Sequence, residues 1–355
     1  MKKVLLKDIA KLACVSQMTV SRVINTPEKV HPDTRQSVED AMNRLNYRSN
    51  AVTQTSMAEK SRNIRLLVIY DAHNFPNTFL PLFLRGIHEV IARNNYNLIL
   101  HFDKHDGRNR IINESEWSHT NSDGFLILSV DSNAEALSQL SHKLQESNTP
   151  VVIVNQVIDT QDTSYVSCDD FGGGFKATSY LINKGHRNIG IISGSEQYST
   201  SSDRFKGFLS ALDEHGISFN QASHVEGHYT KEGGYEAMGK LHRNLPNMTA
   251  VFCTSDLMAL GAMKYCLDKN IRIPDDISII GYDDMDFTSM LNPALTTVRK
   301  DRERMGKDAA EILLNLINGY NKPIQLKLDT EVIERESVKR HKTFNQKEDT
   351  ICYQQ

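Results

Sequence analysis

The chain has 355 residues, of which 39% are hydrophobic, 24% charged and 7% aromatic, and its formal net charge is −3. These values are typical of a globular protein of two or three domains, and they exclude a collagen-like, coiled-coil or wholly disordered chain. The sequence has no apolar run near the roughly 18 residues that a membrane span needs, no signal-peptide core and no CxxC pair among its five cysteines. We therefore expect a cytoplasmic protein with no membrane segment, no disulfide framework and no zinc site.

The charge is unevenly distributed along the chain. Residues 1–62 hold 11 Lys/Arg and 6 Asp/Glu, a net charge of +5, so the remaining 293 residues carry −8. A basic head on an acidic body indicates a module that binds a polyanion, joined to a larger body. The alternative interpretation is a solvated basic surface without such a ligand.

Residues 1–47 predict three short helices, which form the first domain. The first helix ends near Ala13, and the third covers residues 33–45. Between them, Ser16 is placed to cap a second helix after a two-residue turn. This order predicts a helix-turn-helix, in which the second helix presents its first side chains to the major groove of DNA. The alternative is a helical bundle with a charged surface.

The segment LKDIAKLACVSQMTVSRVIN, residues 6–25, resembles the DNA-binding head of the LacI/GalR family of bacterial repressors. The family pattern is roughly KDVAxxAGVSxxTVSRVLN. The positions that match it in unbroken register are Lys7, Asp8, Ala10, Ala13, Val15, Ser16, Thr19, Val20, Ser21, Arg22, Val23 and Asn25. Cys14 stands where the family usually has glycine, and a cysteine at positive φ would cost on the order of 1 kcal/mol.

The resemblance implies which side chains of the head contact DNA. Gln17 and Met18 occupy the two positions that read bases, where Gln can pair with adenine and Met can pack on a thymine methyl group. Ser21 and Arg22 are further candidates for the major groove. Contacts to phosphate are expected from three other polar side chains, Ser16, Thr19 and Asn25. Helix capping or solvent exposure is the alternative role for Thr19 and Ser21.

Residues 48–63 are expected to form a linker, or hinge, between the head and the body. The usual family segment, YxPNAxARxL, forms a short helix on DNA and inserts its leucine into the minor groove. Here Ser49, Gln54 and Ser56 replace the proline, the arginine and the leucine, whereas Asn50 is kept and is included among the expected DNA contacts. We therefore expect a linker that is weakly helical or unfolded even on operator DNA.

From residue 64 onward, continuous apolar runs alternate with helical stretches. The runs are RLLVIYD, NLILHFD, GFLILSV, VVIVN, NIGIIS, AVFCTSD and ISIIGYD, and the helical stretches cover residues 79–94, 134–147, 172–184, 203–215, 233–243 and 257–269. This alternation predicts parallel sheets covered by helices on both faces, and seven strands fit two α/β lobes better than one. The predicted fold is therefore a small all-α helix-turn-helix domain followed by a two-lobed α/β core over residues 64–338. Residues 339–355 are polar and are expected to be a disordered tail.

The predicted helix over residues 79–94 carries a broad apolar stripe, made of Leu80, Phe83, Leu84, Ile87, Val90 and Ile91. The stripe is wide enough to serve both its own lobe and a second copy of the chain, so it predicts a homodimer. The alternative is a helix that is simply well buried.

Segments of the body are similar to the periplasmic-binding-protein-like effector core of the same family. They are CDDFGGGFKATSYLINKGHRNIGIISG, SDLMALGAM, IPDDISIIGYDD and PALTTV. The resemblance implies a small polyhydroxylated effector, and the branches that respond to nucleosides or sugar acids look closest. It also implies that Asp283 and Arg204 contact effector hydroxyls and that Tyr229 stacks on a flat face of the ligand. Ser255 occupies a position where several sugar-binding members carry asparagine.

The remaining effector candidates are placed near the ends of predicted strands or at a family position. Open α/β sheets bind ligands at the carboxyl ends of their strands, where Asp71 stands. Asp169 matches the acidic position that opens its segment in the family, with capping of the following helix as its alternative role. Phe79 is a candidate for the pocket or for the core, and Asp71 for the pocket or for a cap.

The body shows no catalytic constellation, metal site or cofactor motif. Residues 172–174 are three glycines but do not form GxGxxG, and no P-loop is present. His186 has no nucleophile partner in the sequence and is interpreted as structural. The carboxylate pairs at residues 275–276 and 283–284 lie on opposite sides of one strand, which disfavours a metal site. We therefore expect no cofactor, no metal and no enzymatic activity.

The combined prediction is a ligand-responsive DNA-binding transcriptional regulator, most simply a repressor. A homodimer would bind a near-palindromic double-stranded operator through its two heads. A small-molecule effector, a sugar, sugar acid or nucleoside, would close the two lobes and either release or recruit the protein. The alternatives are a periplasmic-type solute-binding protein and a non-inducible DNA-binding protein with the same core. A nicotinamide dehydrogenase is disfavoured because no glycine follows the first strand.

Overall fold

The computed structural model describes residues 6–25, 30–44, 61–71, 79–105, 121–129, 134–146 and 149–341. The chain divides into two units, a helical head within residues 1–62, to which residues 118–122 are assigned, and an α/β body that begins at Asn63. The predictions for residues 48–60 of the linker, including Asn50, and for residues 342–355 of the tail fall outside this description, whereas Asn63, the last predicted linker residue, begins the first strand. None of the described helices is both long and apolar enough to cross a membrane.

The head consists of three helices, as predicted from the sequence: α1 (Leu6–Leu12), α2 (Gln17–Asn25) and α3 (Pro32–Arg44). Each helix contributes a pair of neighbouring apolar side chains to a small core, which contains Ile9, Ala10, Val20, Val23, Val38 and Ala41. Packing of this kind stabilises short helices that would be marginal alone. It also leaves the opposite side of α2 exposed.

The turn between α1 and α2 is held by local hydrogen bonds. Cys14 has a φ of 54°, so the chain keeps the left-handed conformation to which the family's glycine is suited. The backbone N–H of Val15 donates to the carbonyl oxygen of Ala10 at 3.0 Å. The Ser16 Oγ accepts from the backbone N–H of Thr19 at 3.1 Å, which confirms its predicted role as the cap of α2.

The described part of the body contains two six-stranded sheets, one in each lobe. The first lobe has the strand order β11-β5-β4-β3-β1-β2, with all pairs parallel. The second lobe has the order β12-β10-β9-β8-β6-β7, in which β12 alone pairs antiparallel. The bounds in the first lobe are β1 (Asn63–Asp71), β2 (Asn97–His105), β3 (Gly124–Ser129), β4 (Val151–Val154), β5 (Ser164–Cys168) and β11 (Gln325–Leu328). Those in the second are β6 (Ile189–Ser193), β7 (His224–Glu226), β8 (Ala250–Cys253), β9 (Ser278–Asp283), β10 (Thr296–Arg299) and β12 (Glu331–Ile333).

Five strands and one helix were not predicted from the sequence. The strands β5, β7, β10, β11 and β12 are three to five residues long and carry polar side chains, so no continuous apolar run marks them. The helix that was not predicted is α10 (Arg302–Ile317). Its cap was visible in the sequence as Asp301, which accepts from the N–H of Arg304. These omissions matter because β5, β10, β11 and α10 carry the chain between the lobes.

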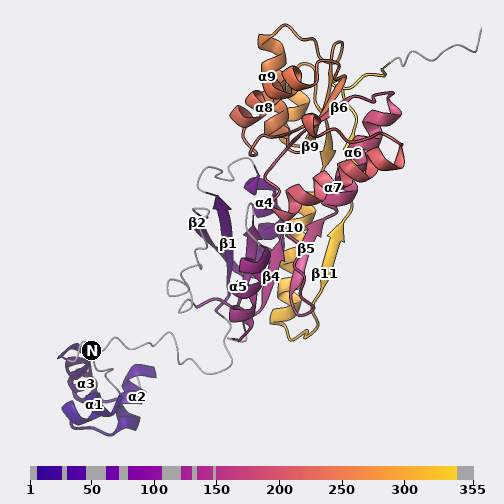
Figure 1. The fold of residues 1–355 in the computed structure, drawn as a ribbon. Helices are drawn as coiled ribbons and strands as arrows, with labels where there is room; N and C mark the ends of the chain where they lie inside the picture. The colour runs from indigo at the N-terminus through magenta and orange to yellow at the C-terminus, as the bar shows by residue number, and fades with distance from the viewer. Residues whose placement is uncertain are drawn as a thin grey trace, which may run out of the picture. The chain divides into compact units, whose positions relative to one another are not determined.

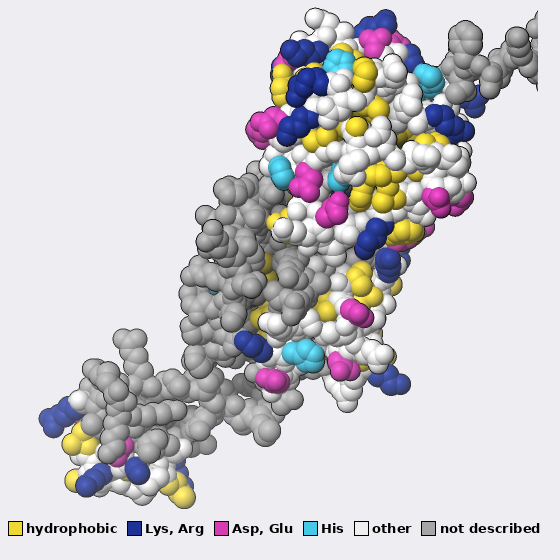
Figure 2. Space-filling model, in the orientation of Figure 1, with side chains coloured by type: hydrophobic (Ala, Val, Ile, Leu, Met, Phe, Trp, Pro, Cys, Tyr) yellow, Lys and Arg dark blue, Asp and Glu magenta, His cyan; other side chains and the backbone are white. Residues whose placement is uncertain are grey.

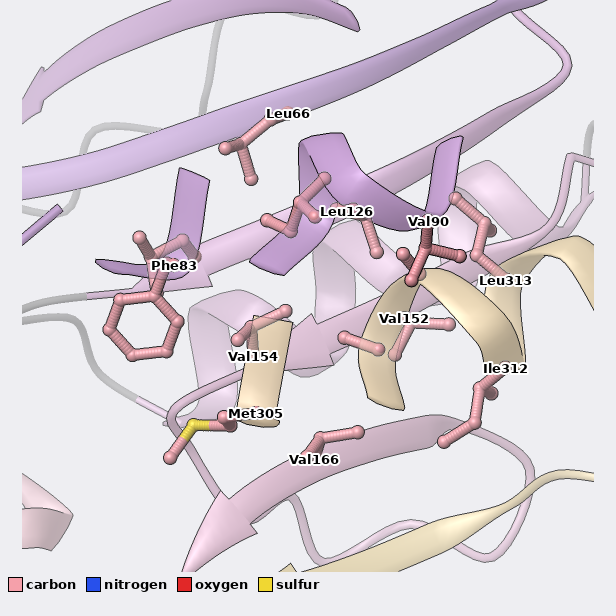
Figure 3. Close-up of a cluster of buried hydrophobic side chains, with 14 of the residues drawn as sticks. Leu66, Phe83, Val90, Leu126, Val152, Val154, Val166, Met305, Ile312 and Leu313 are labelled. Atoms are coloured by element: carbon pink, nitrogen blue, oxygen red, sulfur yellow. The ribbon is translucent and has the colours of Figure 1, made fainter. Parts of the chain in front are cut away.

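Helices α4 (Leu80–Arg93) and α10 cover one face of the first sheet, and α5 (Ala134–Glu146) covers the other. Figure 3 shows the cluster under α4 and α10, in which side chains of both helices meet those of the sheet: Leu66, Phe83, Val90, Leu126, Val152, Val154, Val166, Met305, Ile312 and Leu313. The two helices approach so closely that a Cβ added to Gly86 would lie 2.0 Å from the carbonyl oxygen of Glu303.

This packing accounts for the apolar stripe of α4. The side chains of Leu80, Phe83, Ile87, Val90 and Ile91 are buried within their own lobe. Leu84, the remaining member of the stripe, is partly buried against the same cluster. The stripe therefore provides no separate argument for a subunit interface.

The second lobe has the same layered construction. Helices α6 (Asp170–Asn183) and α7 (Ser199–Glu214) cover one face of its sheet, and α8 (Lys231–Asn244) and α9 (Asp256–Asp268) cover the other (Figure 1). Two short 3-10 helices complete it, η3 (Gln221–Ser223) before β7 and η4 (Asp286–Met290) after β9. The predicted two-lobed α/β fold is confirmed.

The chain passes between the lobes three times, in short connections that we call the interlobe junction. They are residues 168–170 between β5 and α6, residues 299–302 between β10 and α10, and residues 328–331 between β11 and β12. Each connection leaves a parallel strand at its carboxyl end. The carboxyl ends of both sheets therefore face the junction, and this is where open α/β sheets bind ligands.

Candidate DNA-binding surface and effector site

Helix α2 presents the predicted base-reading side chains to solvent. Gln17, Met18 and Arg22 are exposed, and Met18 is 65% exposed although it is apolar. Thr19 and Ser21 are half-buried. The Oγ atoms of Ser16 and Thr19 lie 2.9 Å apart at the start of the helix, so both take part in the cap. An exposed methionine beside an exposed glutamine is the arrangement that readout of a base edge and a thymine methyl group requires.

Two predicted DNA contacts cannot be placed on this surface. Asn25 is the last residue of α2, and its side chain lies outside the described residues, as does Asn50 altogether. The described part of the head exposes five basic side chains, Lys7, Lys11, Arg22, Arg35 and Arg44. On the body, Figure 2 shows Lys and Arg interspersed with Asp and Glu over the face in view.

A buried network of charges occupies the interlobe junction. At its centre is Asp170, the first residue of α6, which accepts from the Nε of Arg204 at 2.8 Å. The Nζ of Lys300 lies 3.3 Å from the same carboxylate and donates to the Oδ1 of Asn155 at 3.0 Å. Burial alone would raise the pKa of Asp170, but the charges of Lys300 and Arg204 outweigh it and hold that pKa below its ordinary value. The network links the residue directly after β4, helices α6 and α7, and the connection after β10.

Arg204 and Asp283, the predicted effector contacts, lie together in this network. The Nη2 of Arg204 is 3.7 Å from the Oδ1 of Asp283, and the guanidinium stacks on the Tyr282 ring, 3.9 Å from its centroid. Asp283 ends β9 with a φ of 111°, a strained conformation for a residue other than glycine. Its buried Oδ1 has no hydrogen-bond partner among the described residues, and burial raises its pKa against the opposing charge of Arg204. A carboxylate oxygen of this kind can accept a hydrogen bond from a hydroxyl group.

Ser255 and Asp256 form hydrogen bonds within the second lobe, close to the interlobe junction. Ser255 caps α9, where its Oγ accepts from the N–H of Met258 at 3.3 Å. Asp256 accepts from the Oγ1 of Thr297 at 2.6 Å and from the N–H of Met285 at 2.8 Å. Burial, together with the nearby Asp283, raises the pKa of Asp256 well above its ordinary value. Ser255 therefore has an observed structural role where the sequence suggested a pocket role.

Asp169 has its alternative role as a helix cap. Its Oδ1 accepts from the N–H of Gly172 at 3.1 Å and lies 3.0 Å from the Nζ of Lys327. The carboxylate thus ties the connection between β5 and α6 to strand β11. Asp71 is the last residue of β1, and its side chain lies outside the described residues.

Two aromatic candidates approach the network from different lobes. Phe79, just before α4, packs on Phe83 with ring centroids 5.1 Å apart and lies 5.5 Å below the guanidinium carbon of Arg302. Tyr229, after β7, has a φ of 56°, and a Cβ added to Gly194 would meet its ring at 2.0 Å. Tyr229 also interacts electrostatically with Arg204. Both aromatic rings therefore border the charged centre.

Sequence reasoning missed Lys300 and Arg302, which are both in the junction and both 2% exposed. The Nη2 of Arg302 donates to the carbonyl oxygens of Asp283 at 3.1 Å and Asp284 at 3.3 Å. The signal was the charged segment RKDRER directly after TTV. It went unrecognised because β10 was not predicted, so these residues were not placed at the carboxyl end of a strand. Among the described residues, no three His, Cys, Asp or Glu side chains gather as a metal site.

A helix-turn-helix head joined to a two-lobed body with a polar interlobe junction defines a ligand-responsive DNA-binding regulator. Comparison with known proteins supports this class. The family model for bacterial regulatory proteins of the lacI family matches residues 5–50, and a periplasmic binding protein-like domain matches residues 178–338.

Full-length relatives define the family. The chain is 34% identical over 339 residues to the probable HTH-type transcriptional repressor ExuR of Bacillus subtilis, covering 95% of this chain and 99% of the relative. It is 33% identical to the HTH-type transcriptional repressor PurR of Pasteurella multocida, covering 94% and 98%. The chain belongs to the LacI family. The family consists of DNA-binding transcriptional regulators, so the prediction that the chain is not an enzyme is confirmed.

Solved structures agree with this assignment. The complex of the transcriptional regulator CelR with cellobiose matches with a TM-score of 0.71 and 30% identity, covering 94% of this chain and 100% of that one. A LacI family regulator from Enterococcus faecium with bound ribose matches with a TM-score of 0.69 and 26% identity, covering 78% and 100%.

Proposed function

We propose that the chain is a repressor that binds a near-palindromic operator as a homodimer and is switched by a small polyhydroxylated effector at the interlobe junction. The observation that carries the effector site is the buried Arg204–Asp283 pair, in which the Asp283 Oδ1 lacks a hydrogen-bond partner among the described residues. The repressors ExuR and PurR among the relatives support the direction of regulation. The domain assignment is a head over residues 1–47, a linker over 48–63, a core over 64–338 and a tail beyond it, in a protein that acts in the cytoplasm.

The proposed DNA contacts lie on α2. Gln17 and Met18 read bases from the major groove, and Ser21 and Arg22 add to the same surface. Ser16, Thr19, Asn25 and Asn50 contact the phosphate backbone and set the register without reading sequence. The exposure of Gln17, Met18 and Arg22 supports this division.

The proposed effector contacts follow from donor and acceptor chemistry. A carboxylate such as Asp283 accepts hydrogen bonds from hydroxyl groups, and the guanidinium of Arg204 donates to hydroxyl or ring oxygens. Tyr229 and Phe79 supply aromatic surfaces on either side. The complexes of related regulators with cellobiose and ribose support a sugar-like ligand. Because such a ligand would touch both lobes, it would favour one lobe arrangement and shift operator affinity by that difference alone.

The test begins with selection of an operator from a random duplex pool by the full-length protein. A thermal-shift screen of sugars, sugar acids and nucleosides then identifies compounds that raise Tm, and operator affinity is measured with and without them. In Asp283→Asn the effector response should be lost, because the substitution removes a charged acceptor for the effector's hydroxyl groups. Operator binding should persist, because Asp283 is not part of the head. The matched control is Asp286→Asn, which changes an exposed carboxylate at the start of η4. A normal response in Asp283→Asn would show that the assignment is wrong.

A further inference from the structure

The guanidinium of Arg302 is buried and incompletely paired. The residue is 2% exposed and opens α10 at the interlobe junction. Its Nη2 donates to two backbone carbonyl oxygens, those of Asp283 and Asp284. Its Nε and Nη1 have no hydrogen-bond partner among the described residues, which leaves three N–H donors without an acceptor. A buried cation that is incompletely paired lowers the stability of the folded protein, so this arrangement indicates a functional role for Arg302.

The other buried arginine of the junction shows what full pairing looks like. The Nε of Arg204 donates to Asp170 and its Nη1 donates to the carbonyl oxygen of Thr254, while its Nη2 faces Asp283. All three nitrogens of Arg204 therefore have an oxygen within reach. Arg302, by contrast, forms no ion pair with a described carboxylate.

The carboxylates nearby already serve other groups. Asp170 is shared by Arg204 and Lys300, and Asp301 caps α10. Asp284 pairs with Arg299 and Arg335, at 2.7 Å and 2.6 Å. Asp256 accepts from Thr297 and Met285, and burial favours its neutral form. Asp283 contacts Arg302 through its backbone carbonyl oxygen, so among the described residues no carboxylate forms an ion pair with Arg302.

The charge balance at the junction points the same way. Arg204, Lys300 and Arg302 are three buried cations, and the buried carboxylates that lie beside them are Asp170 and Asp283. The third buried carboxylate, Asp256, accepts from Thr297 and Met285 and forms no ion pair with these cations among the described residues. One positive charge remains. A ligand with a single negative charge would balance it, and a carboxylate offers two planar oxygens that suit a guanidinium.

The position of Arg302 places that anion beside the proposed hydroxyl site. Its Nη2 donates to the backbone of Asp283, whose side chain is the proposed acceptor for effector hydroxyls, and Phe79 of the first lobe lies against its guanidinium. We infer that the effector is a sugar acid whose carboxylate binds Arg302 while its hydroxyls bind Asp283 and Arg204. This inference rests on the proposed effector site. Neutral sugars and nucleosides can offer hydroxyl or ring oxygens to the Nε and Nη1 of Arg302, but they bring no negative charge to balance the guanidinium.

The test compares acids with their neutral parents on the full-length protein by isothermal titration calorimetry. The probes are D-galacturonate and D-glucuronate, their methyl esters, D-galactose, D-glucose and the corresponding 6-phosphates. We expect at least one acid to bind about tenfold or more tightly than its ester and its parent sugar, because only the acid pairs with the guanidinium.

Variants of Arg302 separate its role from a general effect on folding. Arg302→Gln should reduce binding of the acid by about tenfold or more and remove its advantage over the ester. Arg302→Lys keeps the charge and should retain part of the preference, which protects the test if the Gln variant fails to fold. Arg304→Gln, an exposed arginine on the same helix, is the matched control and should bind as the wild type does. Operator binding without ligand verifies that each variant is folded.

The outcomes distinguish this inference from the proposed function. Neutral sugars that bind through Asp283 as tightly as the acids, or an Arg302→Gln variant that keeps the acid preference, would overturn the inference alone. Tighter binding of a sugar phosphate than of the acid would overturn the assignment of a carboxylate. If no sugar-like compound binds and Asp283→Asn changes nothing, the junction is not the effector site and both proposals fail.

Discussion

Lys300→Met tests whether the interlobe junction is held by its charge balance. The Lys300 side chain is fully buried, and its Nζ lies 3.0 Å from the Oδ1 of Asn155 and 3.3 Å from the Oδ1 of Asp170. The substitution removes the donor to Asn155 and leaves Asp170 with Arg204 as its remaining ion pair. Removing one partner of a buried pair costs about 3–5 kcal/mol. Since Arg204 stays paired with Asp170, we expect the free energy of unfolding to fall by about 3 kcal/mol, the lower end of this range.

The assay is thermal and chemical unfolding of the full-length chain, followed by circular dichroism. A loss of about 3 kcal/mol corresponds to a fall in Tm of roughly 6–12 °C for a body of this size. The control is Lys206→Met, because the Lys206 side chain is 63% exposed and pairs with Asp203 at 3.7 Å, so it should change stability by less than about 0.5 kcal/mol.

A double variant refines the reasoning. Lys300→Met combined with Asp170→Asn removes both charges of the pair. Its loss in the free energy of unfolding should therefore be about 1–2 kcal/mol smaller than the sum of the losses in the two single variants. A loss below about 1 kcal/mol in Lys300→Met would refute the view that this lysine neutralises Asp170. Strict additivity in the double variant would do the same.

Three further predictions concern the head and the second lobe. Gln17→Ala should weaken operator binding by about 1–3 kcal/mol at one base position and relax specificity there, whereas an equal loss on every operator variant would make Gln17 a backbone contact. Cys14→Gly should stabilise the head by up to about 1 kcal/mol in denaturation experiments, because residue 14 has a φ of 54°, and no gain would contradict the strain. Burial raises the pKa of Asp256 above its ordinary value of 3.8, so the folded state holds this proton more tightly and stability falls as pH rises above that value. Between about pH 5 and pH 8, the Tm of Asp256→Asn should therefore fall less than the Tm of the wild type. If Tm fell equally with pH in both proteins, Asp256 would not be the group that makes stability depend on pH.

The head could be predicted in detail because its signals are local. Ser16 caps α2 from three residues before Thr19, and the apolar pairs of α2 and α3 are three residues apart, at helical spacing. The long apolar runs of the body were equally clear, and they correspond to β1, β2, β3, β4, β6, β8 and β9. Residues 79–94 were also predicted correctly as a helix, whereas the partner of its apolar stripe was not, because α10 had been missed.

The sequence by itself determined the three-helix head and the alternating α/β pattern of the body, and the family resemblance gave Arg204 and Asp283 as candidate ligand contacts. Only the tertiary structure decided that Lys300, Arg302 and Asp170 share one buried site, since they come from segments up to 132 residues apart that meet where the chain crosses between lobes. Short strands such as β10 are stabilised by their neighbours in the sheet, not by their own four residues, so their sequence carries little signal. Whether a charged side chain is paired or left without an acceptor is likewise a property of the assembled junction, because burial and partners both come from distant parts of the chain.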